Sequence, residues 1–342
     1  MSEEAGPTHA LVTGSNALVS GATGFLGGFL LAKLREKGFR VRALVRRTSD
    51  ISGLLRAKIE LSEGDILDRP SLCRAMEGQQ LVFHTAGKVS EWGKRREFWQ
   101  ANVEGTANVI AACRDAGVKR LIHVSSLSVL GLPRSGDPVD ENTPPDDAAR
   151  DFYTASKIAG EKLVREAHGQ GDLETVIIRT GVIWGPGENP ILSRLEALMR
   201  RRRFFLIDGG RNRIGLSHVE NLSQGMILAA LAPSAAGQVY HMTDGEMLTA
   251  HAAFYALATV LGVEPPRVSL PFPIAYALAA VQEWSARLRQ TAAPPALTRY
   301  GVRMVASDSR YDISKAQNEL GYKPLLTFSQ GIKTLHATNG KP

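Results

Sequence analysis

Cysteine is scarce in this sequence, and this scarcity limits the kinds of site that it can build. Among 342 residues only Cys73 and Cys113 are cysteines, and 40 positions separate them. No CxxC pair is present, so neither a disulfide framework nor a zinc cluster can be assembled. A reducing compartment, the cytoplasm, is the simplest setting for such a chain.

Long apolar runs are also missing. No stretch reaches the roughly 18 apolar residues that a membrane-spanning helix needs, so we expect no transmembrane segment. The nearest approach, residues 270–281, contains two prolines. Such a segment is more typical of a core or of a substrate-pocket lining, with weak peripheral membrane contact as the alternative. Residues 1–16 lack the basic start and apolar centre of a signal peptide, and we expect a loosely ordered tail there.

Motifs for metal binding and for hydrolysis are absent as well. The eight histidines include no HExxH pair, and no GxSxG elbow occurs. We therefore expect no metal site and no serine hydrolase. The basic run at residues 200–203 follows a helical stretch and has no aromatic residues interleaved with it. We interpret it as a solvated helix end and expect no nucleic-acid partner.

What the sequence does contain is typical of a globular protein. Apolar residues make up 44% and charged residues 22%. At roughly 150 residues per domain, the length suggests two domains. The net charge of +7 is compatible with nucleic acid, anionic lipid, a phosphorylated ligand or solubility alone, and composition does not choose among them.

Short β-rich runs alternate with helical segments through the first half of the chain. This alternation is typical of βαβ units, so we predict an α/β fold with a doubly wound parallel sheet of the Rossmann type over residues 17–185. Prolines and glycines become frequent beyond it, which indicates a smaller, mixed C-terminal substrate domain over residues 186–342, with some chain returning to the first. Strands are predicted near residues 17–21, 40–46, 58–62, 80–86, 119–125 and 174–179, and helices near 25–37, 69–76, 100–116 and 151–167.

The first strand precedes a glycine-rich turn. Residues 10–14 nearly duplicate residues 17–21, but only the second copy continues into the glycines, spaced as GxxGxxG. Such glycines permit a tight turn, close approach of a pyrophosphate and packing of helix on strand. The helix that follows would present free N–H groups and a positive dipole to the phosphates. The residues expected to bind a dinucleotide cofactor here are Gly21, Thr23, Gly24, Phe25, Leu26 and Gly27.

The end of the second strand indicates which dinucleotide is bound. Arg46 and Arg47 stand there, and no carboxylate does. An acidic residue at this point would bond the ribose 2′-hydroxyl of NAD, whereas guanidinium groups suit a 2′-phosphate. NADP(H) is therefore the preferred cofactor and NAD(H) the alternative. If the two arginines bind no cofactor, they form a solvated basic turn.

A tyrosine, a lysine and a serine could carry acid–base chemistry. Tyr153 and Lys157 begin a predicted helix and share one of its faces. An ammonium group, together with an oxidised nicotinamide ring, favours phenolate and lowers the pKa of a phenol, which makes the pair competent. Upstream, Ser125 and Ser126 end an apolar strand, where a hydroxyl can hydrogen-bond a substrate carbonyl or alcohol.

The order of these motifs resembles the extended short-chain dehydrogenase/reductase superfamily, from about residue 17 almost to the end. Within it the chain looks most like the 3β-hydroxysteroid dehydrogenase group, which includes sterol dehydrogenases and 2-alkyl-3-ketoacid reductases. The stretches that carry the resemblance are Ser20–Gly27, Glu63–Ile66, His84–Gly87, Asn102–Thr106, Val124–Gly131, Tyr153–Lys157, Arg179–Pro186, Ser217–Asn221, Tyr311–Ala316 and Leu320–Pro324.

The resemblance implies roles for individual residues. Ser126 would polarise the substrate, Tyr153 would be the acid–base, and Lys157 would bind the cofactor ribose and lower the phenol's pKa. Asn102 would support the site from its helix. The remaining implied cofactor contacts are Asp65 and Ile66 at the adenine, then Thr85, Ala86, Gly87, Thr180 and Val182. A homodimer through the helices near 100–116 and 151–167 is implied in the same way.

Two departures from the superfamily pattern qualify this picture. Thr180 follows Arg179 where proline is usual, which puts the fine contact to nicotinamide in doubt. Leu130 precedes Gly131 where sugar-nucleotide enzymes usually have tyrosine, which counts modestly against a sugar substrate.

The leading hypothesis is an NADP(H)-dependent oxidoreductase, a ketoreductase that interconverts a secondary alcohol and a ketone. Its substrate would be an apolar small molecule, either sterol-like or a β-hydroxy or β-keto compound. One alternative is a nucleotide-sugar epimerase with tightly bound NAD. The other is a non-catalytic NADP(H)-sensing scaffold, against which the intact Ser126, Tyr153 and Lys157 argue.

Overall fold

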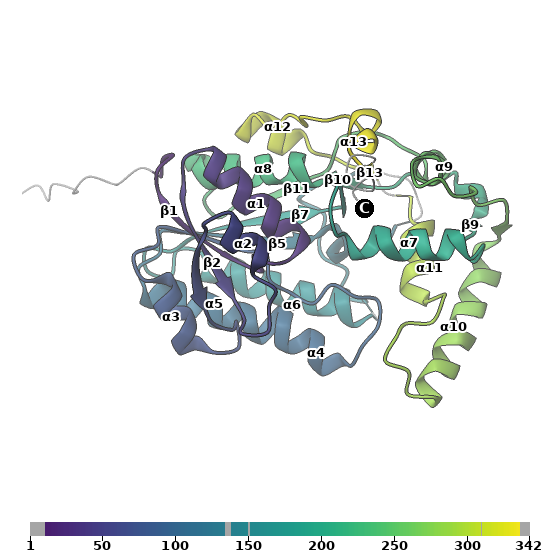
Figure 1. Ribbon diagram of the computed structural model, residues 1–342, viewed down its shortest axis with the longest axis horizontal. Coiled ribbons are helices and arrows are strands. Elements are labelled where there is room, and N and C mark those ends of the chain that lie inside the picture. The colour runs from purple at the N-terminus through teal and green to yellow at the C-terminus, as the bar shows by residue number, and fades with distance from the viewer. Residues whose placement is uncertain (1–10, 134–137, 150, 309, 336–342) are drawn as a thin grey trace, which may run out of the picture.

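A sheet of seven parallel strands forms the centre of the molecule (Figure 1). The computed structural model describes residues 11–133, 138–149, 151–308 and 310–335. The predicted Rossmann-type α/β fold is confirmed. In spatial order the strands are β11 (Val239–Met242), β7 (Glu174–Thr180), β5 (Arg120–Ser126), β4 (Leu81–His84), β1 (Asn16–Ser20), β2 (Arg40–Val45) and β3 (Glu60–Glu63).

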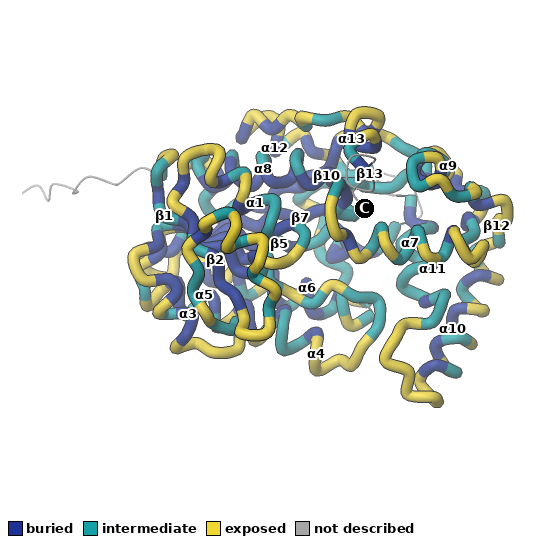
Figure 2. The backbone as a smooth tube through the Cα atoms, in the orientation of Figure 1, coloured by how far each residue is buried: buried dark blue, intermediate teal, exposed yellow. Residues whose placement is uncertain are grey.

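The first strand is the second of the two similar segments, as predicted. β1 begins at Asn16, whereas residues 11–15 belong to no strand. The rest of the expected tail, residues 1–10, lies outside the described part of the chain. Within the sheet, residues 17–19 and all of β4 are buried, because parallel strands are covered on both faces. Figure 2 shows these inner strands as buried.

Helices cover both faces of the sheet. On one face pack α1 (Phe25–Glu36), α8 (Val219–Leu231) and α12 (Ser314–Leu320), whose buried side chains join one apolar cluster. On the other face pack α3 (Arg69–Met76), α5 (Gly105–Asp115) and α6 (Phe152–Ala167), which join a second cluster. A short helix, α2 (Ser52–Arg56), lies between β2 and β3.

The chain reverses its direction of travel across the sheet between β1 and β4, which are neighbours. A crevice forms at such a switch point, beyond the carboxyl ends of the strands, and ligands of α/β folds bind there. The glycine-rich turn follows β1 and residues 85–87 follow β4, so the predicted cofactor segments meet at this crevice.

One predicted helix differs in detail. The segment expected near 100–116 is part of a longer helical run that begins with α4 (Arg95–Trp99) and passes through a π-helical turn, Gln100–Glu104, into α5. A π-turn inserts an extra residue into the helical repeat and is frequent at functional sites. The predicted site residue Asn102 lies within it.

The second half of the chain contributes to both parts of the molecule. α8, β11 and α12 return to the Rossmann sheet, and the other elements form a cap around two further apolar clusters. The domain boundary predicted at residue 185 therefore stays a prediction. One strand of the Rossmann sheet, β11, comes from beyond that residue. The remaining helices are α7 (Pro190–Arg200), α9 (Ala250–Val260), α10 (Phe272–Leu288), α11 (Arg299–Ala306) and α13 (Phe328–Thr334).

Short strands and turns complete the structure. Three two-stranded parallel pairs connect distant segments. They are β8 (Val182–Trp184) with β10 (Leu216–His218), β9 (Leu206–Ile207) with β12 (Ser269–Leu270), and β6 (Pro138–Val139) with β13 (Arg310–Tyr311). Single 3₁₀ turns occur at Leu127–Leu130, Asp208–Gly210 and Pro233–Ala235.

The apolar segment over residues 270–281 forms the first part of α10 and has two different faces. Ala275 and Ala279 are buried against Val302, as expected of core. Ile274 and Val281, by contrast, are 52% and 63% exposed. No helix in the described residues is long and apolar enough to cross a membrane.

Candidate active site

The glycine-rich turn joins β1 to α1, and it leaves no room for side chains. Gly21 has a φ of +71°, and a Cβ there would lie 2.7 Å from the backbone nitrogen of Ala86. A Cβ on Gly27 would lie 2.1 Å from the Gly21 carbonyl oxygen. Gly24 is the N-cap of α1 and offers no side-chain cap, so the first N–H groups of the helix can bind an anion. This cradle fits a dinucleotide pyrophosphate.

The other predicted residues of the turn differ in their surroundings. Thr23 is exposed and Phe25 is half-buried at the start of α1. Leu26 is buried in the core below the turn. Its side chain therefore cannot contact a cofactor at the surface of the turn, and any contribution must come from its backbone N–H.

Arg46 and Arg47 follow β2, but only one of them is available to a phosphate. Arg47 Nε donates to Glu63 Oε1 over 2.9 Å, and Glu63 ends β3. Arg46 is exposed, and its guanidinium has no hydrogen bond or ion pair with any described residue. Glu63, which the sequence analysis did not connect with this site, therefore makes Arg46 the better candidate for a 2′-phosphate.

The predicted adenine segment and the predicted cofactor segment after β4 lie along the same edge of the sheet. Asp65 and Ile66 follow β3, and the Ile66 carbonyl accepts a hydrogen bond from Asn108 Nδ2 over 3.0 Å. Thr85 follows β4, and its Oγ1 donates to the carbonyl of Ser20 over 2.6 Å. That bond ties the segment after β4 to the end of β1, where the glycine-rich turn begins.

Asn102 connects the segment after β4 to the helix that carries Tyr153. Its Oδ1 accepts the Lys88 N–H over 2.8 Å, and its Nδ2 donates to the Lys88 carbonyl and, over 2.9 Å, to Ser156 Oγ. Ser156 Oγ in turn donates to the Tyr153 carbonyl over 2.8 Å. A Cβ on Gly87 would lie 2.8 Å from Asn102 Oδ1. Asn102 is thus a positioning residue for both segments.

Ser126, Tyr153 and Lys157 converge at the ends of β5 and α6. Ser126 is the last residue of β5, and its Oγ accepts the Ser128 N–H over 3.2 Å. The Ser126 hydroxyl also interacts with the Tyr153 phenol. Lys157, one helical turn further along α6, donates from Nζ to the Val124 carbonyl over 2.6 Å. The structure therefore brings together the three residues that the sequence predicts.

The surroundings of these groups set their protonation. Burial raises the pKa of Tyr153, the Ser126 hydroxyl lowers it, and the Asp151 carboxylate raises it again, with a net increase. Burial lowers the pKa of Lys157 to about 8, against the opposing charge of Glu161. In the protein alone the phenol is therefore protonated at neutral pH.

Thr180 ends the strand that lies beside Ser126, and Val182 begins the next one. Thr180 ends β7 and is in register with Ser126 on β5. Gly181 donates its N–H to Ser217 Oγ over 2.9 Å, and Val182 begins β8. The threonine that replaces the usual proline therefore stands next to the predicted substrate-polarising serine.

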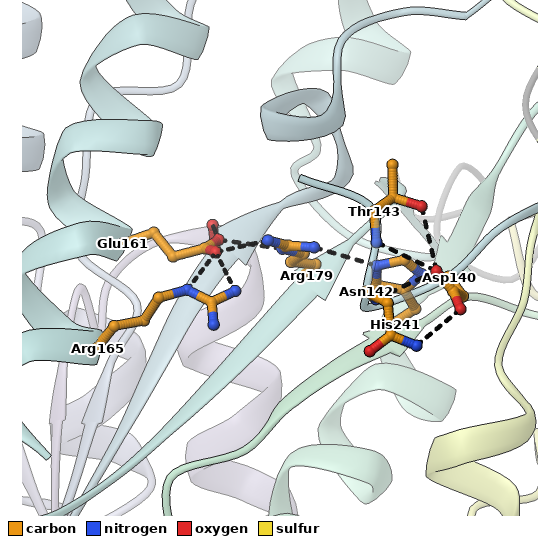
Figure 3. A network of polar contacts seen from close by, with 8 residues as sticks. Asp140, Asn142, Thr143, Glu161, Arg165, Arg179 and His241 are labelled. Carbon is orange, nitrogen blue, oxygen red and sulfur yellow. Dashed lines mark hydrogen bonds and ion pairs between the residues drawn. The ribbon is translucent and has the colours of Figure 1, made fainter. Parts of the chain in front are cut away.

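A buried ion pair lies behind the site, and the sequence analysis did not predict it (Figure 3). Glu161 Oε1 accepts from Arg179 over 2.7 Å, and both side chains are almost fully buried. Glu161 Oε2 also accepts from Ser125 Oγ over 2.7 Å. Arg165, one helical turn after Glu161, binds the same carboxylate on the more exposed side of the network. On the opposite side, Arg179 contacts the ring of His241 on β11. The pair fixes α6 to β5 and β7.

Replacing Glu161 by glutamine should lower the free energy of unfolding by about 3 to 5 kcal/mol at pH 7, because it leaves the buried charge of Arg179 unpaired. Burial alone raises the pKa of Glu161, but the bonds and charge of Arg179 outweigh it, and the pKa lies below 4.5. The pair therefore contributes stability above pH 4.5, which is lost as the pH falls through the lowered pKa.

Chemical unfolding of the Glu161→Gln variant and the parent at several pH values checks this prediction. The difference between them should shrink below pH 4.5. Arg165→Gln is the matched control, since this more exposed partner should contribute less than about 1 kcal/mol. Equal losses in the two variants would contradict the assignment.

An open cleft of about 840 Å³ lies in front of Tyr153, between the Rossmann sheet's helices and the cap. Aromatic side chains are prominent in its lining: Trp92, Phe98, Phe152, Tyr153, Tyr276 and Tyr300. The rings of Tyr153 and Tyr300 meet edge to face with centroids 5.9 Å apart. Tyr300 comes from α11 in the cap, and no sequence signal marked it, because only the tertiary fold brings the two tyrosines together.

A profile of the 3-beta hydroxysteroid dehydrogenase/isomerase family matches residues 18–272. The chain belongs to this family. As a member of the 3β-hydroxysteroid dehydrogenase family it is an NAD(P)-dependent oxidoreductase of the extended short-chain type that acts on a CH–OH or keto group. The resemblance inferred from the motifs is thereby confirmed.

Family members of similar length carry several different names. The 4-hydroxy-2-methyl-3-oxo-4-farnesyl-3,4-dihydroquinoline-1-oxide ketoreductase of Stigmatella aurantiaca is 35% identical, with 93% of this chain and 94% of that protein covered. A 2-alkyl-3-oxoalkanoate reductase of Shewanella oneidensis is 29% identical, with 95% and 86% covered. A 3 beta-hydroxysteroid dehydrogenase/Delta 5-->4-isomerase of Mycobacterium tuberculosis is 30% identical, with 92% and 88% covered.

Solved structures agree with this family fold. The crystal structure of gox2253 has a TM-score of 0.78 and 30% identity, with 94% of this chain and 97% of that chain covered. MoeE5 in complex with UDP-glucose and NAD has a TM-score of 0.73 at 23% identity, with 95% and 98% covered. At that identity the likeness to MoeE5 concerns the fold alone.

Proposed function

We propose that this protein is an NADP(H)-dependent ketoreductase that interconverts a secondary alcohol and a ketone on an apolar substrate, either sterol-like or a β-hydroxy or β-keto compound. The observation that carries the proposal is the position of Tyr153, which lines the cleft while its hydroxyl interacts with Ser126. Relatives named as ketoreductases and 3-oxoalkanoate reductases support the same chemistry.

The three residues divide the proton chemistry among them. When bound, the nicotinamide supplies or accepts a hydride at the substrate carbon. In reduction, Tyr153 donates its proton to the carbonyl oxygen, and its raised pKa keeps the phenol in the donating form at neutral pH. The Ser126 hydroxyl bonds the same oxygen and stabilises the negative charge that develops there. Lys157 would hold the cofactor ribose from the buried side of α6.

The preference for NADP(H) is proposed to depend mainly on Arg46. Replacing Arg46 by glutamine should lower the ratio of kcat/KM for NADPH to that for NADH about 10- to 100-fold, as expected for a lost bond to a charged group. Steady-state assays with both cofactors measure this ratio. Arg47→Gln should have a smaller effect, because Arg47 is engaged with Glu63. Equal use of the two cofactors by the parent enzyme would contradict the assignment.

The surroundings of the enzyme are part of the same proposal. A cytoplasmic setting follows from the cysteine content, and a homodimer through α5 and α6 follows from the resemblance. Weak peripheral contact with a membrane would involve the outer face of α10, where Ile274, Leu278, Val281, Trp284 and Leu288 are each at least 44% exposed. The exposed Arg289 follows this helix, which favours an anionic lipid surface over a cationic one.

A further inference from the structure

A row of polar side chains crosses three neighbouring strands of the buried sheet. Ser20, His84 and His123 are in register on β1, β4 and β5, and all three are buried. Polar groups in such a place normally have hydrogen-bond partners within the protein. The partners of each ring therefore indicate what it does.

His84 is hydrogen-bonded at both ring nitrogens. Its Nδ1 lies 2.8 Å from Ser20 Oγ, and its Nε2 lies 3.2 Å from Thr106 Oγ1 on α5. Thr106 donates its hydroxyl proton to the Asn102 carbonyl over 2.8 Å, so its oxygen must accept the hydrogen bond from Nε2. In a neutral ring Nδ1 is then the acceptor, and Ser20 donates to it.

The surroundings of His84 preserve this arrangement of protons. Burial, assisted by the ammonium of Lys157, lowers the pKa of His84 to about 3. The ring is therefore neutral at physiological pH and has one donor and one acceptor. A charged ring would have two donors, and the Ser20 hydroxyl would lose its acceptor.

The hydrogen bonds of His84 join two separate parts of the site. On one side, the glycine-rich turn follows Ser20 directly, and Ser20 Oγ also accepts the Ala86 N–H over 3.4 Å. On the other side, the Asn102 carbonyl packs against α6, where a Cβ on Gly160 would lie 2.3 Å from its oxygen. His84 therefore links the cofactor turn to the helix that carries the proposed proton donor.

His123 provides a comparison within the same row. It is the register partner of His84 on β5, and the centroids of the two rings are 5.3 Å apart. Neither of its ring nitrogens has a hydrogen-bond partner among the described residues. The two histidines are thus equally buried neighbours, and only His84 bonds groups on both sides of its ring.

We propose that His84 is a positioning residue for the reaction, which holds the glycine-rich turn and α6 at a fixed separation so that hydride transfer and the Tyr153 phenol act on one carbonyl group. This inference rests on the proposed function. Carbon and oxygen of one carbonyl must both be aligned, and a misplacement of about 1 Å can cost about 10²-fold in rate. His84 is not among the residues that line the cleft, so it acts through the segments that it joins.

His84→Phe tests the proposal, because it removes both nitrogens and keeps a planar ring. It should lower kcat for ketone reduction about 10- to 100-fold, change KM for the ketone less than about 3-fold, and weaken NADPH binding about 3- to 10-fold. His123→Phe is the matched control, since it removes no hydrogen bond to a described residue, and should keep kcat within about 3-fold. Expressing kcat per bound NADPH removes the contribution of unfolded protein.

Conservative variants separate positioning from packing. In His84→Gln an amide nitrogen can replace Nε2 at Thr106, and in His84→Asn an amide oxygen can replace Nδ1 at Ser20, so each should recover part of the lost kcat. Thr106→Val keeps the shape of the side chain without its hydroxyl. It should lower kcat about 3- to 10-fold in the parent but less than about 2-fold in His84→Phe, where the link is already broken.

Ser20→Ala and Thr106→Val provide the same test if His84→Phe does not fold, because these residues bond opposite nitrogens of an intact ring. Their combined loss in kcat should be well below the product of the single losses. A combined loss equal to that product would overturn the link through His84.

The outcomes keep this inference separate from the proposed function. Equal kcat losses in His84→Phe and His123→Phe, or equal losses from Thr106→Val in both backgrounds, would overturn the positioning role while the reductase activity stands. If the parent reduces no ketone, the proposed function fails and NADPH binding decides about His84. Affinity that falls in His84→Phe alone would support the link to the turn, and affinity unchanged in both variants would overturn it.

Discussion

The Tyr153→Phe variant should lose about 10²- to 10⁴-fold in kcat for ketone reduction, the range expected when a positioned proton donor is removed. Phenylalanine keeps the ring that packs edge to face on Tyr300, so the cleft should retain its shape. Only the hydroxyl that interacts with Ser126 is lost. KM for the ketone should therefore change much less than kcat.

Steady-state kinetics with NADPH in excess provide this comparison. Tyr255→Phe is a suitable control, because its hydroxyl donates to the Pro266 carbonyl in the cap, away from the cleft. That variant should keep the parental kcat. A Tyr153→Phe enzyme that turns over within a few-fold of the parent would remove Tyr153 from the mechanism.

The second large effect concerns the glycine-rich turn. Gly27→Ala should abolish measurable cofactor binding or weaken it at least about 100-fold, because the new Cβ would lie 2.1 Å from the Gly21 carbonyl oxygen. No Cβ tolerates such a distance, so the turn must open and the first turn of α1 must move. Overpacking of this kind also costs about 1 to 3 kcal/mol in stability.

Gly28→Ala is the matched control for that variant. Gly28 is the next residue of the same helix, yet the nearest atom to its Cβ would be the Ala22 carbonyl oxygen at 3.8 Å. Alanine also favours helix over glycine by about 1 kcal/mol. Titration of intrinsic fluorescence with NADPH, together with thermal unfolding, should show loss in Gly27→Ala and none in Gly28→Ala. Parental affinity in Gly27→Ala would contradict the proposed pyrophosphate cradle.

The fold was predictable because its determinants are local and repeated. Buried parallel strands give short apolar runs, and each run is followed by a helix or a glycine-rich turn. The positions of β1, β2, β4, β5 and β7 along the chain could therefore be predicted from the sequence. The π-turn at Gln100–Glu104 could not be read in this way, since its extra residue has no signature in the hydrophobic pattern. Nor could β11 be assigned to the sheet, because the cap segments that precede α8 separate α8 and β11 from the other sheet strands along the chain.

Site residues were predictable where they lie at the end of a strand or one helical turn apart on the same helix. Ser126 at the end of β5, and Tyr153 with Lys157 on α6, are of this kind. Tyr300 reaches the cleft from α11, and no sequence spacing relates it to Tyr153. Its position depends on how the cap folds over the sheet, which hydrophobic periodicity does not specify.

Contacts with other strands add detail that the sequence patterns do not give. Arg46 and Arg47 are equivalent in sequence, but Glu63 on the adjacent strand engages only Arg47. The Lys157 ammonium donates to the Val124 carbonyl on β5, and its action on the Tyr153 phenol stays a prediction. Both contacts depend on distances to another strand, which sequence patterns do not give.

The central claim is tested most directly by mixing the purified enzyme with NADPH and a long-chain 2-alkyl-3-oxo acid or its methyl ester, and following both cofactor absorbance and the product by mass spectrometry. The account predicts that one NADPH is consumed for each 3-hydroxy product formed, and that Tyr153→Phe suppresses both signals together. If no ketone is reduced, and the enzyme instead retains NAD through purification and epimerises a UDP-sugar, the account is contradicted.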